Sequence, residues 1–568
     1  MPRYDSGSHF GRLLDWHKGG FCSVRPAKEH TNFRQYVEGT LVLETTFRTG
    51  GGEVRVTDFF SMRRGGRRSP RREIVRIIEG TRGRVDMHVQ VEPRFDYGEV
   101  RPWVRRRNIS LFTAIGGDDG LVISCTESLQ QVDRHGLEAT VAVQGGEKVY
   151  LSIQFGRPED LDSKALDAPT AEDLDRRLDE TVKWWRRWSS RGRLDGWDTR
   201  APLQSAIVLK GLTNAPTGAM IAAATTSLPE TIGGGRNWDY RYSWIRDSSF
   251  ALRALGELGF DAEADGFRRF VERSAAGNEQ DLQIVYGPGG ERRLVETEIE
   301  ELGGYRRSKP VRVGNDAYTQ QQHDVYGELL GLSWEWHERG RSPDDDYWRF
   351  LVDLVNGAAD VWRRKDPGLW ELRDAPQHFV HSKVMCWAAL DLGIRLAKES
   401  SRRAPTGRWR KVRDEIRAAV ESRGYDKRRG VFVRAFGTKD MDASLLLLPN
   451  VGFIDWQDDR MVRTADAVWK DLGEDDLIWR YRGPDGMEGE EGAFVACTFW
   501  LAECLARQGR SEEARRVFDR GVATANDLGL FSEEFDPKRG IMLGNFPQGL
   551  SHLSHISAAV ALAQAQPE

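Results

Sequence analysis

The sequence predicts a multidomain α and β protein with an N-terminal antiparallel β-sandwich, a linker helix and a C-terminal toroid of helices. Three observations lead to this prediction. Short runs with a two-residue hydrophobic period fill the chain up to residue 156, and helical periodicity begins after Pro169. From residue 202 onward helices alternate with loops to the end of the chain. Such a change of period indicates separate domains.

The predicted β-sandwich occupies residues 1–165. Leu41–Phe47 and Val54–Phe60 flank the glycine run Gly50–Gly52, a pattern typical of a β-hairpin. Gly, Asp and Pro separate the further strand-like runs, which are Val85–Val91, Leu121–Cys125, Ala139–Val143 and Val149–Phe155. Many short strands with no helical stretch between them favour two packed sheets.

The predicted linker helix lies within residues 166–200. Thr170 is placed to cap its first turn, and Asp173 follows at the spacing of a capping box. The apolar residues after it recur at helical spacing: Leu174, Leu178, Val182, Trp185 and Trp188. One face of this helix is therefore expected to be buried.

Residues 201–568 form the predicted helical domain. Its clearest helices are Met385–Leu396, Phe494–Leu505, which closes at Gly509, and Ser511–Ala525. Because no fixed repeat length is present, a closed toroid is favoured over a solenoid. We expect the loops at one end of the toroid to carry the functional site.

Composition excludes several classes of function. A formal net charge of −4 gives no argument for nucleic acid, and the basic run Arg63–Arg72 is interpreted as a solvated loop. Residues 1–25 lack an apolar signal-peptide core, and no segment reaches transmembrane length. The five cysteines show no metal-ligand spacing. We therefore expect a cytoplasmic protein with reduced thiols, without cofactor, metal, membrane or nucleic-acid partner, and leave room for a homo-oligomer.

The stretch Gly233–Asp247 has the composition of a carbohydrate site. Aromatic rings pack against the C–H face of a pyranose, and Arg and Asp make charge-assisted hydrogen bonds to its hydroxyls. The residues of both kinds in this stretch are Arg236, Trp238, Asp239, Tyr240, Arg241, Tyr242, Trp244, Arg246 and Asp247. A glycine-rich turn before a helix with surface ion pairs is the alternative interpretation. The first interpretation predicts a small carbohydrate as the binding partner.

Two further stretches place acids beside apolar residues. Glu371 follows Trp370 in a loop before a helix, where desolvation would raise the pKa of its carboxyl, as a general acid requires. Glu533 and Glu534 lie in Leu530–Pro537, where one of them could act as a general base. An exposed helix entry and a capping pair at a turn are the alternatives for these acids. A third stretch, from Arg480 to Phe494, carries acids that are also explained by a helix N-terminus.

Together these stretches resemble glycoside hydrolase family 15, which contains glucoamylases, glucodextranases and bacterial-type trehalases. The matching motifs follow the family's order along nearly the whole chain: Pro2–Ser6, Gly235–Asp247, Lys309–Asn315, Gly368–Glu371, Glu490–Phe494, Ser532–Glu534 and Gly544–Gln548. The resemblance implies that the helical domain is an (α/α)6 barrel. It also implies exo-hydrolysis of α-glucosidic bonds with inversion.

By the same resemblance, Glu371 matches the general acid and Glu533 the general base. Arg246 and Asp247 match the pair that binds the non-reducing glucose. The complete predicted substrate-binding set is Tyr240, Trp244, Arg246, Asp247, Trp370, Arg480 and Glu490. The loop Asp374–His378 after the acid differs from the glycine-containing loop more usual in the family.

The predicted function is hydrolysis of a small α-glucoside, with trehalose first and isomaltose or maltose next. A glucoamylase or glucodextranase acting on longer α-glucans is the alternative within the same chemistry. An inverting disaccharide phosphorylase would need one acid and phosphate, and the second carboxylate, Glu533, argues against it. A catalytically inactive sugar-binding protein is the alternative of another class, against which both retained acids argue.

Overall fold

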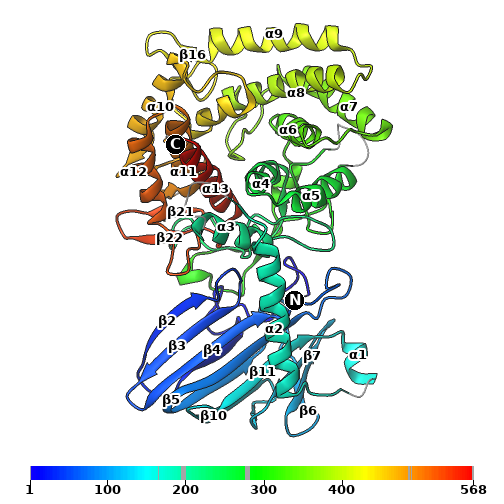
Figure 1. Ribbon diagram of the computed structural model, residues 1–568, viewed down its shortest axis with the longest axis vertical. Coiled ribbons are helices and arrows are strands. Elements are labelled where there is room, and N and C mark those ends of the chain that lie inside the picture. Colours follow the sequence, from blue (N-terminus) through cyan, green and yellow to red (C-terminus); the bar gives the residue numbers. More distant parts are fainter. Residues whose placement is uncertain are drawn as a thin grey trace. The chain divides into compact units, whose positions relative to one another are not determined.

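The computed structural model divides into two compact units (Figure 1). The sandwich unit comprises Met1–Gly192 together with Ile299–Arg307, and the helical unit comprises Arg193–Glu298 together with Ser308–Glu568. The structure describes residues 2–163, 166–193, 200–275, 282–483, 486–487 and 489–565. The short segment 299–307 thus belongs to the first unit although both its neighbours in sequence belong to the second.

Two antiparallel sheets form the sandwich unit (Figure 1). Their strands are β1 (Phe21–Pro26), β2 (Thr31–Tyr36), β3 (Leu43–Thr49), β4 (Gly52–Phe60), β5 (Glu73–Glu92), β6 (Trp103–Arg106), β7 (Leu111–Gly116), β8 (Asp119–Cys125), β9 (Gln130–Val132), β10 (Gly136–Gln144) and β11 (Lys148–Phe155). One sheet has the order β2-β3-β4-β5-β11-β8-β7-β6. The second half of β5 continues into the other sheet, where it pairs with β1 and β10. The predicted hairpin is confirmed, since Thr49 pairs with Gly52 across a two-residue turn.

The core of this unit lies between the two sheets. Val54 and Ile78 from one sheet and Met87 and Val89 from the other belong to a single buried cluster. Side chains in the second half of β5 alternate between buried and half-buried, which is the pattern that identified Val85–Val91 from the sequence. In the first half burial also alternates except where Ile77 and Ile78 are both buried, and the apolar residues of Ile74–Ile78 have no clean two-residue period, so the sequence did not reveal it.

Helix α2 (Ala171–Ser189) covers the outer face of the larger sheet. Leu174 belongs to a buried cluster with strand residues such as Val75 and Tyr150. Thr170 and Asp173 form the predicted capping box, with the Thr170 hydroxyl 3.1 Å from the Asp173 amide. The sandwich unit also contains α1 (Pro158–Ser163) and the 3-10 turn η1 (Asp96–Gly98).

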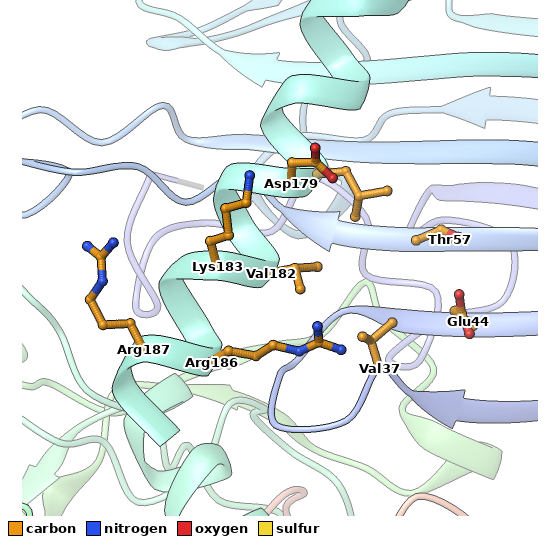
Figure 2. A pocket seen from close by; sticks show the side chains of 9 residues that line it. Val37, Glu44, Thr57, Asp179, Val182, Lys183, Arg186 and Arg187 are labelled. Atoms are coloured by element: carbon orange, nitrogen blue, oxygen red, sulfur yellow. The ribbon is translucent and has the colours of Figure 1, made fainter. Parts of the chain in front are cut away.

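Figure 2 shows a groove of about 460 Å³ beside α2. Its lining residues are Val37, Glu44, Thr57, Leu178, Asp179, Val182, Lys183, Arg186 and Arg187. Arg186 reaches across to the Glu38 carbonyl at 3.3 Å, and the other basic side chains extend into solvent. The groove carries both signs of charge and none of the predicted catalytic residues, so it does not provide the chemistry.

The helical unit is a double ring of helices (Figure 1). Its helices are α3 (Arg200–Gly211), α4 (Ile245–Glu257), α5 (Asp261–Ser274), α6 (Val325–Glu338), α7 (Asp345–Val361), α8 (Val380–Glu399), α9 (Thr406–Arg423), η5 (Ala443–Val451), α10 (Asp459–Leu472), α11 (Val495–Arg507), α12 (Ser511–Val522) and α13 (Gly549–Gln564). Successive neighbours α4, α6, α8, η5, α11 and α13 close an inner ring, because α13 packs on α4. The outer helices α5, α7, α9, α10, α12 and α3 pack against it. This arrangement confirms the (α/α)6 barrel.

The inner and outer helices differ in how much of their surface is buried. The inner helices α8, α11 and α13 are buried around most of their circumference, whereas outer α9 buries only Trp409, Val412, Ile416 and Val420. A helix buried on all sides is apolar throughout, and an outer helix keeps an apolar stripe. The three helices identified from sequence are confirmed as α8, α11 and α12, although the predicted ranges begin one residue before α11 and end three residues after α12.

Short strands and turns connect the helices. They are β12 (Ser243–Trp244), β13 (Val285–Tyr286), β14 (Thr297–Ile299), η3 (Tyr305–Arg307), β15 (Val311–Val313), η4 (Asp316–Thr319), β16 (Tyr425–Asp426), β17 (Val431–Phe432), β18 (Gly473–Glu474), β19 (Leu477–Ile478), β20 (Ala493–Phe494), β21 (Glu534–Asp536) and β22 (Ile541–Leu543). All five cysteines are free thiols. In the part of the chain that the structure describes, no helix has both the length and the apolar character needed to cross a membrane.

Candidate active site

The segments that precede the inner helices meet at one end of the ring. The hydrogen bonds that join them are Trp244 Nε1 to Glu371 Oε1 (2.8 Å), Gln320 Nε2 to the Glu371 carbonyl (3.3 Å), Trp370 Nε1 to Asp442 Oδ1 (3.0 Å) and the Val495 amide to the Glu533 carbonyl (3.0 Å). These residues stand before or at the first turn of α4, α6, α8, η5, α11 and α13. The N-termini of the inner helices therefore surround one site, where their dipoles favour negative charge.

Glu371 lies in a loop that is closed at its base. Asp366 and Gln377 exchange two backbone hydrogen bonds of 3.0 Å, and the Glu371 amide donates to the Gly368 carbonyl at 3.1 Å. Glu371 has a left-handed backbone with φ of 57°, uncommon for a residue with a side chain. Such conformations persist where surrounding contacts fix them, as they do here.

The Glu371 carboxyl accepts a hydrogen bond from Trp244 and has Arg246 Nη1 3.4 Å away. Burial raises the pKa of Glu371 above its ordinary value, and the charge of Arg246 opposes part of that rise. A raised pKa keeps the carboxyl protonated to higher pH. That is the state in which it can donate a proton.

The surroundings of Glu371 differ from the sequence argument in one respect. Trp370, the neighbour expected to desolvate it, turns its indole to Asp442 and stacks on Trp500 with ring centroids 5.8 Å apart. Trp244 is the indole that contacts Glu371. Because the backbone at Glu371 is left-handed, the side chains of Trp370 and Glu371 point in different directions. The order of the residues in the sequence could not show this.

Arg246 and Asp247 lie beneath this carboxyl. Arg246 Nε donates to Asp247 Oδ1 at 2.8 Å, and Arg246 Nη1 donates to the Leu369 carbonyl at 2.9 Å. Asp247 is fully buried, and its Oδ2 atom has no hydrogen-bond partner within the described chain. An unpaired buried carboxylate oxygen is costly unless a ligand donates to it, so this atom is suited to a sugar hydroxyl.

Glu533 lies near the same aromatic residues. Tyr240 is close enough to its carboxylate to lower the pKa of Glu533, and the Tyr240 ring centroid lies 5.6 Å from that of Trp244. Burial raises the pKa of Glu533 well above its ordinary value, with a further rise from Glu230, while Arg480 and Tyr240 lower it. Gly544 has φ of 75° and leaves room for Glu533, because a Cβ there would lie 2.9 Å from Oε2.

Glu534 has a different environment from its neighbour. It begins β21, which pairs with β20, and its Oε2 accepts the Gly492 amide at 2.8 Å. Adjacent side chains of an extended segment point to opposite sides. Glu533 is consequently directed to Tyr240 and Glu534 to the backbone of the strand pair.

Arg480 is held by an acid that the sequence analysis did not select. Arg480 Nε donates to Glu491 Oε2 at 2.7 Å, and Arg236 also binds the Glu491 carboxylate. Glu490, which was predicted to bind substrate, has an exposed side chain and is not brought to this cluster. The acid pair in the sequence did not show which member points inward. In the structure Glu491 contacts Arg480 and Arg236, and Glu490 is exposed.

One group of carboxylates has the spacing of a cation site among the described residues. Oxygens of Glu230, Glu491 and Glu534 lie within 4.8 Å of one another. Arg480 and Arg236 already bind Glu491, and Arg480 Nη2 lies 3.7 Å from Glu230 Oε2. Two guanidinium groups supply the positive charge, so this donor set does not favour a metal ion.

Comparisons with known proteins cover both units. The model of "Glycosyl hydrolases family 15" matches residues 198–560, and that of "Trehalase-like, N-terminal" matches residues 1–184. The trehalase of Mycobacterium tuberculosis is 38% identical over 600 residues, covering 100% of this chain and 86% of that protein. The trehalase of Thermoplasma acidophilum is 35% identical over 575 residues, covering 100% of this chain and 96% of that protein.

A solved structure shows the same fold. A bacterial glucoamylase complexed with acarbose superposes with a TM-score of 0.74 at 13% sequence identity, covering 100% of this chain and 90% of the other. At that identity the likeness concerns the fold alone. It agrees with the sandwich and the double ring of helices described above.

Proposed function

The chain belongs to glycoside hydrolase family 15 and is a glycoside hydrolase acting on α-glucosides, and we propose that it is an inverting, exo-acting trehalase. The observation that carries the proposal is the placement of two carboxyl groups, the buried Glu533 and the largely buried Glu371, beside the neighbouring rings of Tyr240 and Trp244. Glu371 accepts a hydrogen bond from the Trp244 indole, and Glu533 lies near Tyr240.

In the proposed reaction, Glu371 donates its proton to the glycosidic oxygen as the bond to C1 breaks. Glu533 accepts a proton from the water that attacks C1 from the opposite face. Inversion requires room for that water, so we expect the carboxyl groups to be about 6.5–9.5 Å apart. A retaining mechanism would need about 5–5.5 Å.

The glucose to be released would bind below the acids. The fork of Arg246 and the unpaired Oδ2 of Asp247 provide a donor and an acceptor for its hydroxyls. Tyr240 and Trp244 lie beside them, and Trp370 and Arg480 are further members of the predicted set. Glu490 was also predicted, and we leave it out of the proposed site because its side chain is exposed.

Trehalose is the proposed substrate because relatives that match the whole chain are trehalases. Longer α-glucans are the alternative, and the glucoamylase structure does not favour them since it shares only the fold.

Inverting hydrolysis of trehalose gives one β-glucose from the attacked unit and one α-glucose from the leaving unit. Proton NMR of early products, before mutarotation, therefore tests substrate and mechanism together. Equal α and β signals are expected, and α-glucose alone would show retention.

Phosphate dependence separates this proposal from a phosphorylase. A hydrolase releases two glucose molecules at the same rate with and without phosphate, because Glu533 activates water. A phosphorylase would form a glucosyl phosphate and stop when phosphate is removed. Glucose and phosphate ester should be measured in the same reactions.

A further inference from the structure

The side chains of the site differ widely in exposure. The exposed fraction is 1% for Asp247, 17% for Arg246, 20% for Glu371 and 40% for Arg373. Arg373 follows Glu371 by two residues on the same closed loop. The buried end suits the glucose that is cleaved off, so the group on the far side of Glu371 lies toward Arg373.

Arg373 is held in place and is not a free surface residue. Its Nη2 atom donates to both carboxylate oxygens of Glu296 at 3.0 and 3.3 Å, and its guanidinium carbon lies 4.0 Å from the centre of the Trp238 ring. Glu296 is only 10% exposed and is also held by Arg312, whose Nε lies 3.3 Å away. Arg312 in turn lies 4.6 Å from the Trp238 ring.

Trp238 connects Arg373, Glu296 and Arg312 to the segment that carries Tyr240. The carbonyls of Trp238 and Tyr240 accept backbone amides from Ser227 and Ala223 at 2.8 and 2.9 Å. Asp239 between them is completely buried, whereas Trp238 and Tyr240 are both partly exposed. In an extended segment alternate residues share a face, so Trp238 lies on the side of Tyr240, which contacts Glu533.

The Arg373 guanidinium keeps donors available. Within the described residues its hydrogen bonds run through Nη2 alone, which leaves Nε and Nη1 for a ligand. We propose that Arg373, supported by Trp238 and Glu296, forms the subsite for the leaving group, an uncharged polyhydroxylated sugar. Arg373 binds the hydroxyls, while Trp238 and Glu296 are positioning residues. This inference rests on the proposed function of Glu371, because the acid defines which side the leaving group occupies.

A substrate without a leaving sugar tests the subsite. Arg373→Ala should lower kcat/KM for trehalose by about 10- to 100-fold, the range for losing hydrogen bonds to a charged group. Hydrolysis of α-glucosyl fluoride should change less than about threefold, because fluoride does not reach Arg373. Equal losses on both substrates, or no loss on trehalose, would overturn the proposal.

Two further variants keep the result interpretable. Glu296→Gln should cause a smaller loss in the same direction, since Arg373 remains but is held less firmly. Arg349→Ala is the matched control, because Arg349 is a 75% exposed arginine paired with Asp346 away from the site. It should leave both substrates unaffected. If the wild-type protein hydrolyses neither trehalose nor the fluoride, the proposed function itself is wrong, which is a separate outcome.

Discussion

Glu371 combines three features that an acid catalyst needs: burial, a hydrogen bond that orients it and a fixed backbone. Trp244 fixes one oxygen, and the closed loop fixes the main chain. Glu371→Gln keeps the shape and removes the proton. We expect a loss of about 10²–10⁴-fold in kcat on trehalose, measured by glucose release. Hydrolysis of α-glucosyl fluoride should fall much less, because fluoride leaves with little protonation. Turnover of trehalose close to that of the unchanged protein would contradict the assignment.

The pKa shifts of the two acids predict the pH dependence. Glu533 must be ionised to accept a proton, so activity rises with pH through its pKa, which burial raises above the ordinary 4.5. Glu371 must be protonated, so activity falls as pH passes its own raised pKa. The profile of kcat/KM should be a bell with both limbs above pH 4.5. Loss of one limb in Glu371→Gln, measured with the fluoride, would identify the limb that reports this acid.

At the scale of the element, the cap of α2 is a clear case of sequence determining structure. Thr170 accepts the Asp173 amide and Asp173 accepts the Thr170 amide, and the helix then buries its apolar face on the sheet. Thr170→Ala should lower the free energy of unfolding by about 1 kcal/mol, measured by urea denaturation. Thr170→Ser retains the hydroxyl and should restore most of it. An unchanged midpoint for the alanine variant would show that packing alone fixes the helix start.

Elements that bury one face were predictable, and those buried on both faces were not. The hairpin at Gly50–Gly52 and the helix α12 show their periods in the sequence. The first half of β5 does not, because α2 covers its outer face as well. The inner helix η5 is buried from Ala443 to Pro449, and its run of four leucines gave no period that would distinguish it.

At the scale of the whole molecule, the family motifs predicted which stretches form the site, but they did not predict the contacts between its residues. Glu371, Glu533 and the Arg246–Asp247 pair come together because each precedes or begins an inner helix. Glu491, Gln320 and Asp442 were not selected, since their roles arise from long-range contacts. A residue that contacts a catalytic residue from a distant part of the chain shows no pattern in its own local sequence that would predict this contact.

The closed ring also predicts how a chain substrate is cleaved. Asp247 is buried at the inner end of the site, and the opposite ends of α4 and α11 are joined by Arg253 and Glu503 at 2.8 Å. In the proposed exo-acting mechanism a glucan would enter with its non-reducing end, and cleavage would release one glucose at a time. Maltohexaose should give glucose and maltopentaose as first products, resolved by anion-exchange chromatography. It should be hydrolysed more slowly than trehalose, because trehalose is the proposed substrate. Early maltose or maltotriose would show internal cleavage and an open channel instead of a closed ring.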